Sequence, residues 1–366
     1  MSEELERLPT QGAAAGIYET VAHLIVRFRS RVILPARRRI TWFDGLCHKL
    51  ATLAHLTVGD EGMSMEALNR NTARQRAYMT RQQKMASGIA PGVLESLLSS
   101  EEPSLTSSRL CDVREFRMPE IRRSLAALGF EPDAIHRRHW ERAAVAFLVE
   151  KFGYFDSHSA GLGLGVARED LLYLFSNHCG RVTGIDLYLP TFRNGAGIRC
   201  EDVYAHAPFP YRKERLEVVA MDMRALDFSD ATFDFVWSVS SVEHLGAIED
   251  IATTFQEIER VLKRGGRAFI TTEWNRLWQN PAYEPGSICF DPSLYAYLIS
   301  KLTSLRPVTP VHTEQTYHED HFFAHTRVTG SGAAVLPCIN VFWSGTFATP
   351  VLLIFEKQQP TVEVNG

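Results

Sequence analysis

Three glycines at alternate positions, followed by a more distant aspartate, are the residues of this chain best placed to hold a nucleotide cofactor. The stretch HSAGLGLGVARED, residues 158–170, carries Gly161, Gly163 and Gly165 just before a predicted helix. Asp186 ends the next predicted strand, 21 residues beyond Gly165. A glycine-rich first turn lets the backbone approach a cofactor, and an acidic residue at the end of the following strand commonly holds ribose hydroxyls.

These glycines do not form the dinucleotide pattern GxGxxG. Val166 stands three residues after Gly163, and Arg168 stands three residues after Gly165. The pattern therefore argues against hydride transfer, although a nicotinamide-dependent oxidoreductase with an unusual turn stays open as an alternative. A strand-to-helix turn without any ligand is a further alternative.

The elements around these residues predict an α/β sheet. Beyond residue 155, short β-rich runs alternate with helical stretches, which predicts a doubly wound, mostly parallel sheet covered on both faces. We expect seven strands in a Rossmann-like arrangement. Helical spacing of apolar residues predicts helices over 168–178 and over 248 to about 264, the second ending at Gly265 and Gly266. The clearest strands are predicted at 181–188, 216–222, 233–240, 266–274 and 349–356.

Four ordered motifs narrow the choice of cofactor. After the glycines and Asp186 come a strand that ends at Asp222, then Phe233-Asp234 opening another strand, then ERVLKRGGRAFITTE from residue 259. In this order the chain resembles the class I S-adenosylmethionine-dependent methyltransferases over about residues 155–275. Their fourth strand often begins with an FD pair, and their fifth follows an LKxGG turn.

The resemblance implies a cofactor site at the carboxyl ends of the strands. It implies that the three glycines face the methionine part of the cofactor, that Asp186 and Leu187 hold the ribose side, and that Asp222 with the Met223 amide reads the adenine edge. Ser238 to Ser241 would line the site near the sulfonium.

One departure from the family pattern concerns Ser159. The family usually carries Asp or Glu two residues before the first glycine, and this chain has Ser159 there. We expect Glu169, at the start of the following helix, to supply the missing negative charge. A noncatalytic scaffold that has lost the cofactor stays open as an alternative.

Candidate catalytic residues are Glu243, His244 and His321. Glu243 and His244 follow the fourth strand, where an acid or base would reach the methyl acceptor, although His244 also suits a structural role in the loop. His321 belongs to the segment HTEQTYHEDHFFAH, residues 312–325. Its histidines would share one face only on a helix, so we predict no metal site and leave a base or a polar surface open.

The abundance of histidine after the fifth strand favours a hydroxyl acceptor, because an aliphatic hydroxyl benefits from a base whereas an amine needs none. Aromatic and proline-rich insertions at 189–215 and 274–316 suit a small-molecule or glycan acceptor. The net charge of −4 gives no sign of nucleic-acid binding.

The remaining composition indicates compartment and domains. Six scattered cysteines without CxxC spacing and an acidic start predict a cytoplasmic protein, and no apolar run approaches the length of a transmembrane helix.

We expect a helical region over 1–138 that caps the substrate or contacts a membrane or partner, a methyltransferase domain over 139–358, and a disordered tail over 359–366. Six arginines in Arg27–Arg39 suit peripheral membrane contact, a phosphate-bearing partner or a solvated helix face. The sequence leaves the oligomeric state undetermined.

Overall fold

The computed structural model describes residues 92–188, 198–276, 283–284, 287–315, 339–343 and 346–359. The segment Arg27–Arg39, most of the histidine-rich segment including His321, and residues 360–366 of the predicted tail lie outside these residues. None of the described helices is long and apolar enough to cross a membrane.

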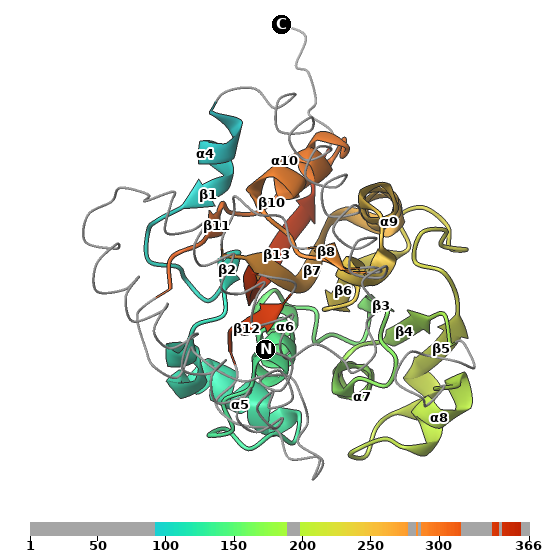
Figure 1. Cartoon of the computed structure of the whole chain (residues 1–366). Helices are drawn as coiled ribbons and strands as arrows, with labels where there is room; N and C mark the ends of the chain where they lie inside the picture. The colour runs from blue at the N-terminus through green and yellow to red at the C-terminus, as the bar shows by residue number, and fades with distance from the viewer. Residues whose placement is uncertain are drawn as a thin grey trace, which may run out of the picture.

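A parallel sheet forms the centre of the fold (Figure 1). Its five central strands lie in the order β7-β6-β3-β4-β5, and each neighbouring pair is parallel. The chain therefore runs outward from β3 in one direction through β4 and β5, and then in the other direction through β6 and β7. The bounds are β3 Ala160–Leu164, β4 Arg181–Asp186, β5 Leu216–Ala220, β6 Phe233–Val239 and β7 Leu262–Asn275.

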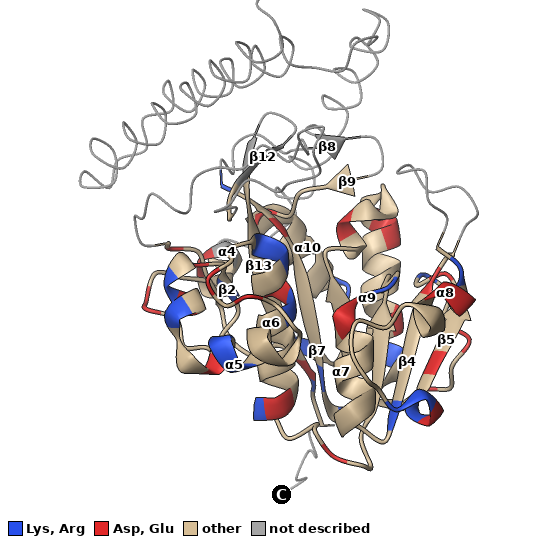
Figure 2. Cartoon of the chain, turned by 90° about the horizontal axis from the view of Figure 1, so that it is seen from below, with Lys and Arg blue, Asp and Glu red and all other residues tan. Residues whose placement is uncertain are grey.

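Additional strands extend the sheet beyond β7. β13 pairs antiparallel with β7 along most of its length, and shorter strands continue the sheet on its far side. These strands are β1 Leu98–Ser99, β2 Arg109–Leu110, β10 Leu305–Pro307, β11 Val311–His312, β12 Val341–Trp343 and β13 Thr346–Lys357. A separate hairpin pairs β8 Tyr283–Glu284 with β9 Ser287–Ile288. In Figure 2, β9 lies at the upper end of the sheet.

The predicted mostly parallel, doubly wound α/β fold is confirmed, and the predicted number of strands is wrong. The sheet contains eleven strands within the described residues instead of seven. Most of the extra strands are only two or three residues long. Such short runs show no alternation of apolar and polar residues, which is why the sequence pattern does not reveal them. Because β1 and β2 belong to the sheet, residues before position 139 also contribute to it.

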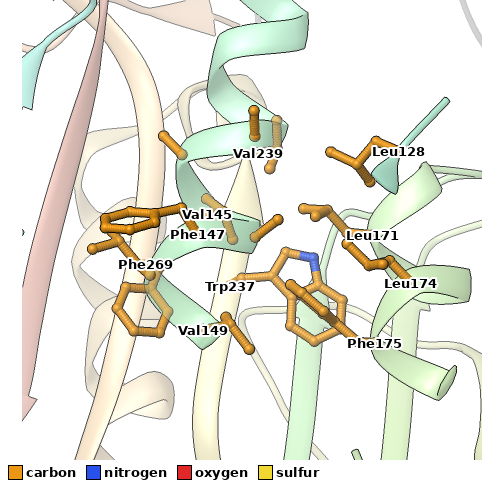
Figure 3. Packing of buried hydrophobic residues seen from close by; sticks show 14 of the residues in the cluster. Leu128, Val145, Phe147, Val149, Leu171, Leu174, Phe175, Trp237, Val239 and Phe269 are labelled. Carbon is orange, nitrogen blue, oxygen red and sulfur yellow. The ribbon is translucent and has the colours of Figure 1, made fainter. Parts of the chain in front are cut away.

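Helices cover both faces of the sheet (Figure 1). On one face α5, α6 and α7 pack with β4, β6 and β7 around Trp237 and Phe269 (Figure 3). On the other face α9 and α10 enclose a second apolar core. The bounds are α4 Val93–Leu97, α5 Pro119–Ala127, α6 Arg137–Lys151, α7 Asp170–His178, α8 Cys200–Ala205, α9 Ile248–Val261 and α10 Pro292–Ser300, with 3-10 turns η3 Val113–Arg117, η4 Lys213–Arg215 and η5 Val242–Leu245.

The passage from α9 to β7 comes earlier than the sequence predicts. The helix ends at Val261, and Leu262 already has extended backbone and pairs with Phe233. Lys263 then forms an ion pair with Asp234 at 2.8 Å, and Asp234 also accepts a hydrogen bond from the Ala160 amide. The FD and LKxGG motifs thus join the amino-terminal ends of three neighbouring strands.

Candidate active site

The order of strands in the sheet reverses between β3 and β6. In open α/β sheets, ligands bind outside the carboxyl ends of the strands at such a point. Gly165 follows β3 and Ser241 follows β6, and the Ser241 hydroxyl donates a hydrogen bond to the Gly165 carbonyl oxygen at 2.8 Å. This bond places the glycine turn and the end of β6 side by side at the reversal point.

Gly165 alone of the three glycines lies in the turn itself. Its φ of +64° is in the left-handed region, and a Cβ atom there would stand 2.6 Å from the Ser241 Cβ. The sulfur-bound methyl of Met223, which follows β5, lies 3.0 Å from the same point. Three parts of the chain therefore converge on Gly165, and only glycine meets both the backbone and the steric requirement.

Gly161 and Gly163 lie inside β3, and neighbouring side chains fill the space next to them. The ring of Phe235 occupies the Cβ position of Gly161. The indole of Trp237 and the Val166 side chain do the same at Gly163. The absence of side chains at both glycines lets two large aromatic residues of β6 pack directly on β3.

Asp186 at the end of β4 fixes the turn after Gly165. One carboxylate oxygen accepts a hydrogen bond from the Ala167 amide at 2.9 Å, and the other accepts one from the Leu187 amide at 2.7 Å. Ala167 has φ +42°, so the bond from its amide supports a strained backbone. A carboxylate has about four lone-pair sites, so Asp186 keeps capacity for a ligand hydroxyl. The Leu187 side chain beside it is 46% exposed.

Asp222 lies after β5 and is engaged by Arg224. The Arg224 guanidinium contacts Asp222 at 2.6 Å and Asp250 at 3.0 Å. Hydrogen bonds from Arg224 hold the pKa of Asp222 below its ordinary value. An adenine amino group would therefore share this carboxylate with Arg224.

Glu169 and Ser238 both face the interior. Glu169 precedes α7, and its buried carboxyl group accepts a hydrogen bond from the Trp237 indole. Burial raises the pKa of Glu169 to about 7, so the group is largely neutral in mildly acidic solution. The buried Ser238 hydroxyl donates to the Leu164 carbonyl oxygen at 3.1 Å and so joins β6 to β3.

A comparison with models of protein families identifies the domain to which these residues belong. Residues 159–270 match the model of the methyltransferase domain family. The chain contains a methyltransferase domain. The resemblance to the class I S-adenosylmethionine-dependent methyltransferases is thereby confirmed for this part of the chain, and S-adenosylmethionine is the cofactor of the domain.

Solved structures similar to the chain share low sequence identity with it. One is a candidate sarcosine dimethylglycine methyltransferase from Galdieria sulphuraria, with 20% identity, 38% of this chain and 46% of that protein covered, and a TM-score of 0.29. Another is the N-methyltransferase NodS from Bradyrhizobium japonicum WM9 in complex with S-adenosylhomocysteine, with 14% identity, coverages of 55% and 79%, and a TM-score of 0.32. A third is the cyclase SpnF, with 15% identity, coverages of 69% and 99%, and a TM-score of 0.41.

The chain thus spans about half the length of the Galdieria protein, 46%, and most of the length of the other two. No curated protein sequence matches the chain.

Glu243 and His244 follow β6 of the methyltransferase domain, next to the point where the strand order reverses. Glu243 in η5 is 1% exposed, and its Oε2 accepts a hydrogen bond from the Thr272 hydroxyl at 3.1 Å. Its Oε1 has no hydrogen-bond partner among the described residues and lies 4.0 Å from the His244 Nε2. His244 is 55% exposed. The third candidate, His321, lies outside the described residues.

Several residues near the carboxyl end of β6 belong to no motif by which the sequence would reveal their position. Glu141 on α6 accepts a hydrogen bond from the Ser240 hydroxyl at 2.9 Å. Arg137, one turn earlier, forms ion pairs with Glu141 and with Glu273 at the end of β7. Glu141 and Ser240 are 99 residues apart, so no local spacing predicts their contact. Within the described part of the chain, no group of three or more His, Cys, Asp or Glu is arranged to hold a metal ion.

Proposed function

We propose that the domain transfers a methyl group from S-adenosylmethionine to a hydroxyl oxygen of a small-molecule or glycan acceptor, with Glu243 as the general base. The observation that supports this most is the position of Glu243. It stands three residues beyond Ser240, at the carboxyl end of β6, and it keeps one carboxylate oxygen without a hydrogen-bond partner among the described residues.

The chain's own residues fit the cofactor. Gly165 lets the turn after β3 lie against Ser241, Asp186 retains acceptor capacity, and Leu187 presents an exposed apolar side chain beside it. We assign Gly165, Asp186, Leu187 and Met223 to cofactor contact. Asp222 contributes through the geometry of its turn, since Arg224 occupies much of its carboxylate.

The predicted roles of the other candidates change in this proposal. Gly161, Gly163 and Ser238 would act by holding β3 and β6 together, because their neighbours lie in the core. Glu169 would act by fixing Trp237, because its carboxyl group is buried against the indole.

When bound, S-adenosylmethionine supplies a methyl group on a good sulfonium leaving group, so the protein mainly positions the acceptor. An acceptor hydroxyl hydrogen-bonded to Glu243 Oε1 would pass its proton to that oxygen as the hydroxyl oxygen attacks. Thr272 holds the other oxygen and thereby orients the carboxylate. His244, exposed and 4.0 Å away, is suited to relay the proton to solvent.

The experiment is a labelled-methyl transfer screen over hydroxylated small molecules, sugars and amines. We expect label on a hydroxyl oxygen and a loss of about a hundredfold in kcat for Glu243→Gln. Glu131→Gln, on an exposed loop, is the matched control and should leave the rate unchanged. Label found on amine nitrogens alone, or full activity in Glu243→Gln, would contradict the proposal. The cytoplasmic location predicted from the cysteines remains part of the same proposal.

A further inference from the structure

Ser240 lies at the end of β6 in a backbone conformation that residues other than glycine seldom adopt. Its φ is +45°, in the left-handed region, and the residue is only 6% exposed. For a residue other than glycine this backbone costs free energy, so surrounding contacts must hold it in place. Because Glu243 follows three residues later, the path of the turn fixes the position of the proposed base.

Two contacts hold Ser240: its amide donates a hydrogen bond to the Thr271 carbonyl oxygen of β7 at 2.9 Å, and its side chain contacts a distant helix. The Ser240 hydroxyl donates a hydrogen bond to Glu141 Oε2 at 2.9 Å. Glu141 is fully buried in α6, and the Arg138 guanidinium meets the same oxygen at 2.9 Å. Arg137 lies 4.0 Å from the other oxygen, so two cations offset the buried charge.

The next residue carries the contact on to the cofactor turn. The Ser241 hydroxyl donates to the Gly165 carbonyl oxygen at 2.8 Å. Two successive serines therefore tie one turn to α6 on one side and to the glycine turn on the other. A change in the backbone at Ser240 would move the partner of Gly165.

We propose that Glu141 is a positioning residue for the cofactor site and acts through Ser240. The inference rests on the proposed function, since it assumes that S-adenosylmethionine binds at the Gly165 turn. Glu141 itself contacts neither cofactor nor acceptor in this account. It selects the conformation of the 240–243 turn, and that turn sets the affinity for the cofactor.

Two substitutions at Ser240 separate this role from general stabilisation. Ser240→Ala removes the hydroxyl and keeps the strained backbone, whereas Ser240→Gly removes the hydroxyl and also removes the strain. We expect calorimetry with S-adenosylhomocysteine to give about tenfold weaker binding for Ser240→Ala, the effect of one lost hydrogen bond. Ser240→Gly should stay within about threefold of the unsubstituted chain, because glycine adopts the turn without the tether.

Ser124→Ala is the matched control. Ser124 is 5% exposed in α5, and its hydroxyl donates to a carbonyl of its own helix at 3.3 Å. It should bind S-adenosylhomocysteine as the unsubstituted chain does. Thermal unfolding of every variant checks that the variant is folded when its affinity is compared with that of the unsubstituted chain.

Glu141→Met tests the hydrogen bond of Ser240 from its other end, because methionine fills a similar volume and its sulfur is only a weak hydrogen-bond acceptor. We expect it to weaken binding about tenfold when Ser240 is present and to add no further loss in Ser240→Gly. Should Glu141→Met fail to fold, the two Ser240 variants decide alone. Equal losses in Ser240→Ala and Ser240→Gly, or no loss in Ser240→Ala, would overturn the inference. No binding by the unsubstituted chain would instead contradict the proposed cofactor site.

Discussion

The Phe235 ring of β6 fills the space in which a side chain at Gly161 of β3 would begin. The two residues are register partners in neighbouring parallel strands. A glycine that appears in the sequence as part of a cofactor turn therefore has a packing role in the sheet. The same holds for Gly163 and Trp237.

Gly161→Ala should destabilise the fold by about 1–3 kcal/mol, because the added methyl overpacks a rigid aromatic contact. Chemical denaturation measures the change. Phe235→Leu makes room for the methyl group, so the double variant should lose less stability than the two single changes together predict. Strict additivity of the two changes would argue against the contact.

Gly165→Ala should act mainly on cofactor binding. The new Cβ would meet Ser241 at 2.6 Å, in a backbone that already disfavours alanine. We expect a loss of at least about tenfold in affinity for S-adenosylhomocysteine. Gly129→Ala is the control, since Gly129 has φ +76° and nothing within 4 Å of its Cβ position. It should bear a similar backbone cost and keep its affinity, and equal losses in the two variants would show that backbone strain alone is responsible.

Glu169 should make stability depend on pH. Burial raises its pKa from 4.5 to about 7, so the unfolded chain loses this proton at lower pH than the folded chain does. The group's contribution is therefore complete below pH 4.5 and is lost as pH rises toward 7, by about 3 kcal/mol in total.

Glu169→Gln removes this dependence and leaves an acceptor for the Trp237 indole. The free energy of unfolding of the variant, relative to the unsubstituted chain, should rise between pH 4.5 and pH 8 by about 3 kcal/mol. Glu131→Gln, on an exposed loop, should show no such trend. Parallel stability curves for Glu169→Gln and the unsubstituted chain would refute the raised pKa.

The sequence predicts the central elements well because their signals are local. The apolar spacing of α9 and the β-rich runs of β4 and β6 each lie within one stretch of chain. The wrong end of α9 has a tertiary cause, since Leu262 pairs with Phe233 and so becomes strand. The short strands beyond β7 depend on partners far away in sequence, and two or three residues carry no period.

The site shows the same division between local and distant signals. Asp186, Leu187 and Gly165 come from motifs at fixed offsets, and the structure brings Gly165 and Asp186 to one turn. Which glycines face a ligand depends on the aromatic residues of a neighbouring strand, 74 residues away in the case of Gly161 and Phe235. The contact between Glu141 and Ser240 is equally invisible to any local pattern.

We propose that the carboxyl ends of β3, β4, β5 and β6 form one site for S-adenosylmethionine. The most direct measurement is calorimetric titration of the full chain with S-adenosylhomocysteine, in parallel with a nicotinamide dinucleotide and with Asp186→Asn. We predict saturable binding of S-adenosylhomocysteine, no binding of the dinucleotide, and about tenfold weaker binding of S-adenosylhomocysteine in Asp186→Asn. Binding of the dinucleotide instead, or an unchanged affinity for S-adenosylhomocysteine in Asp186→Asn, would contradict this site.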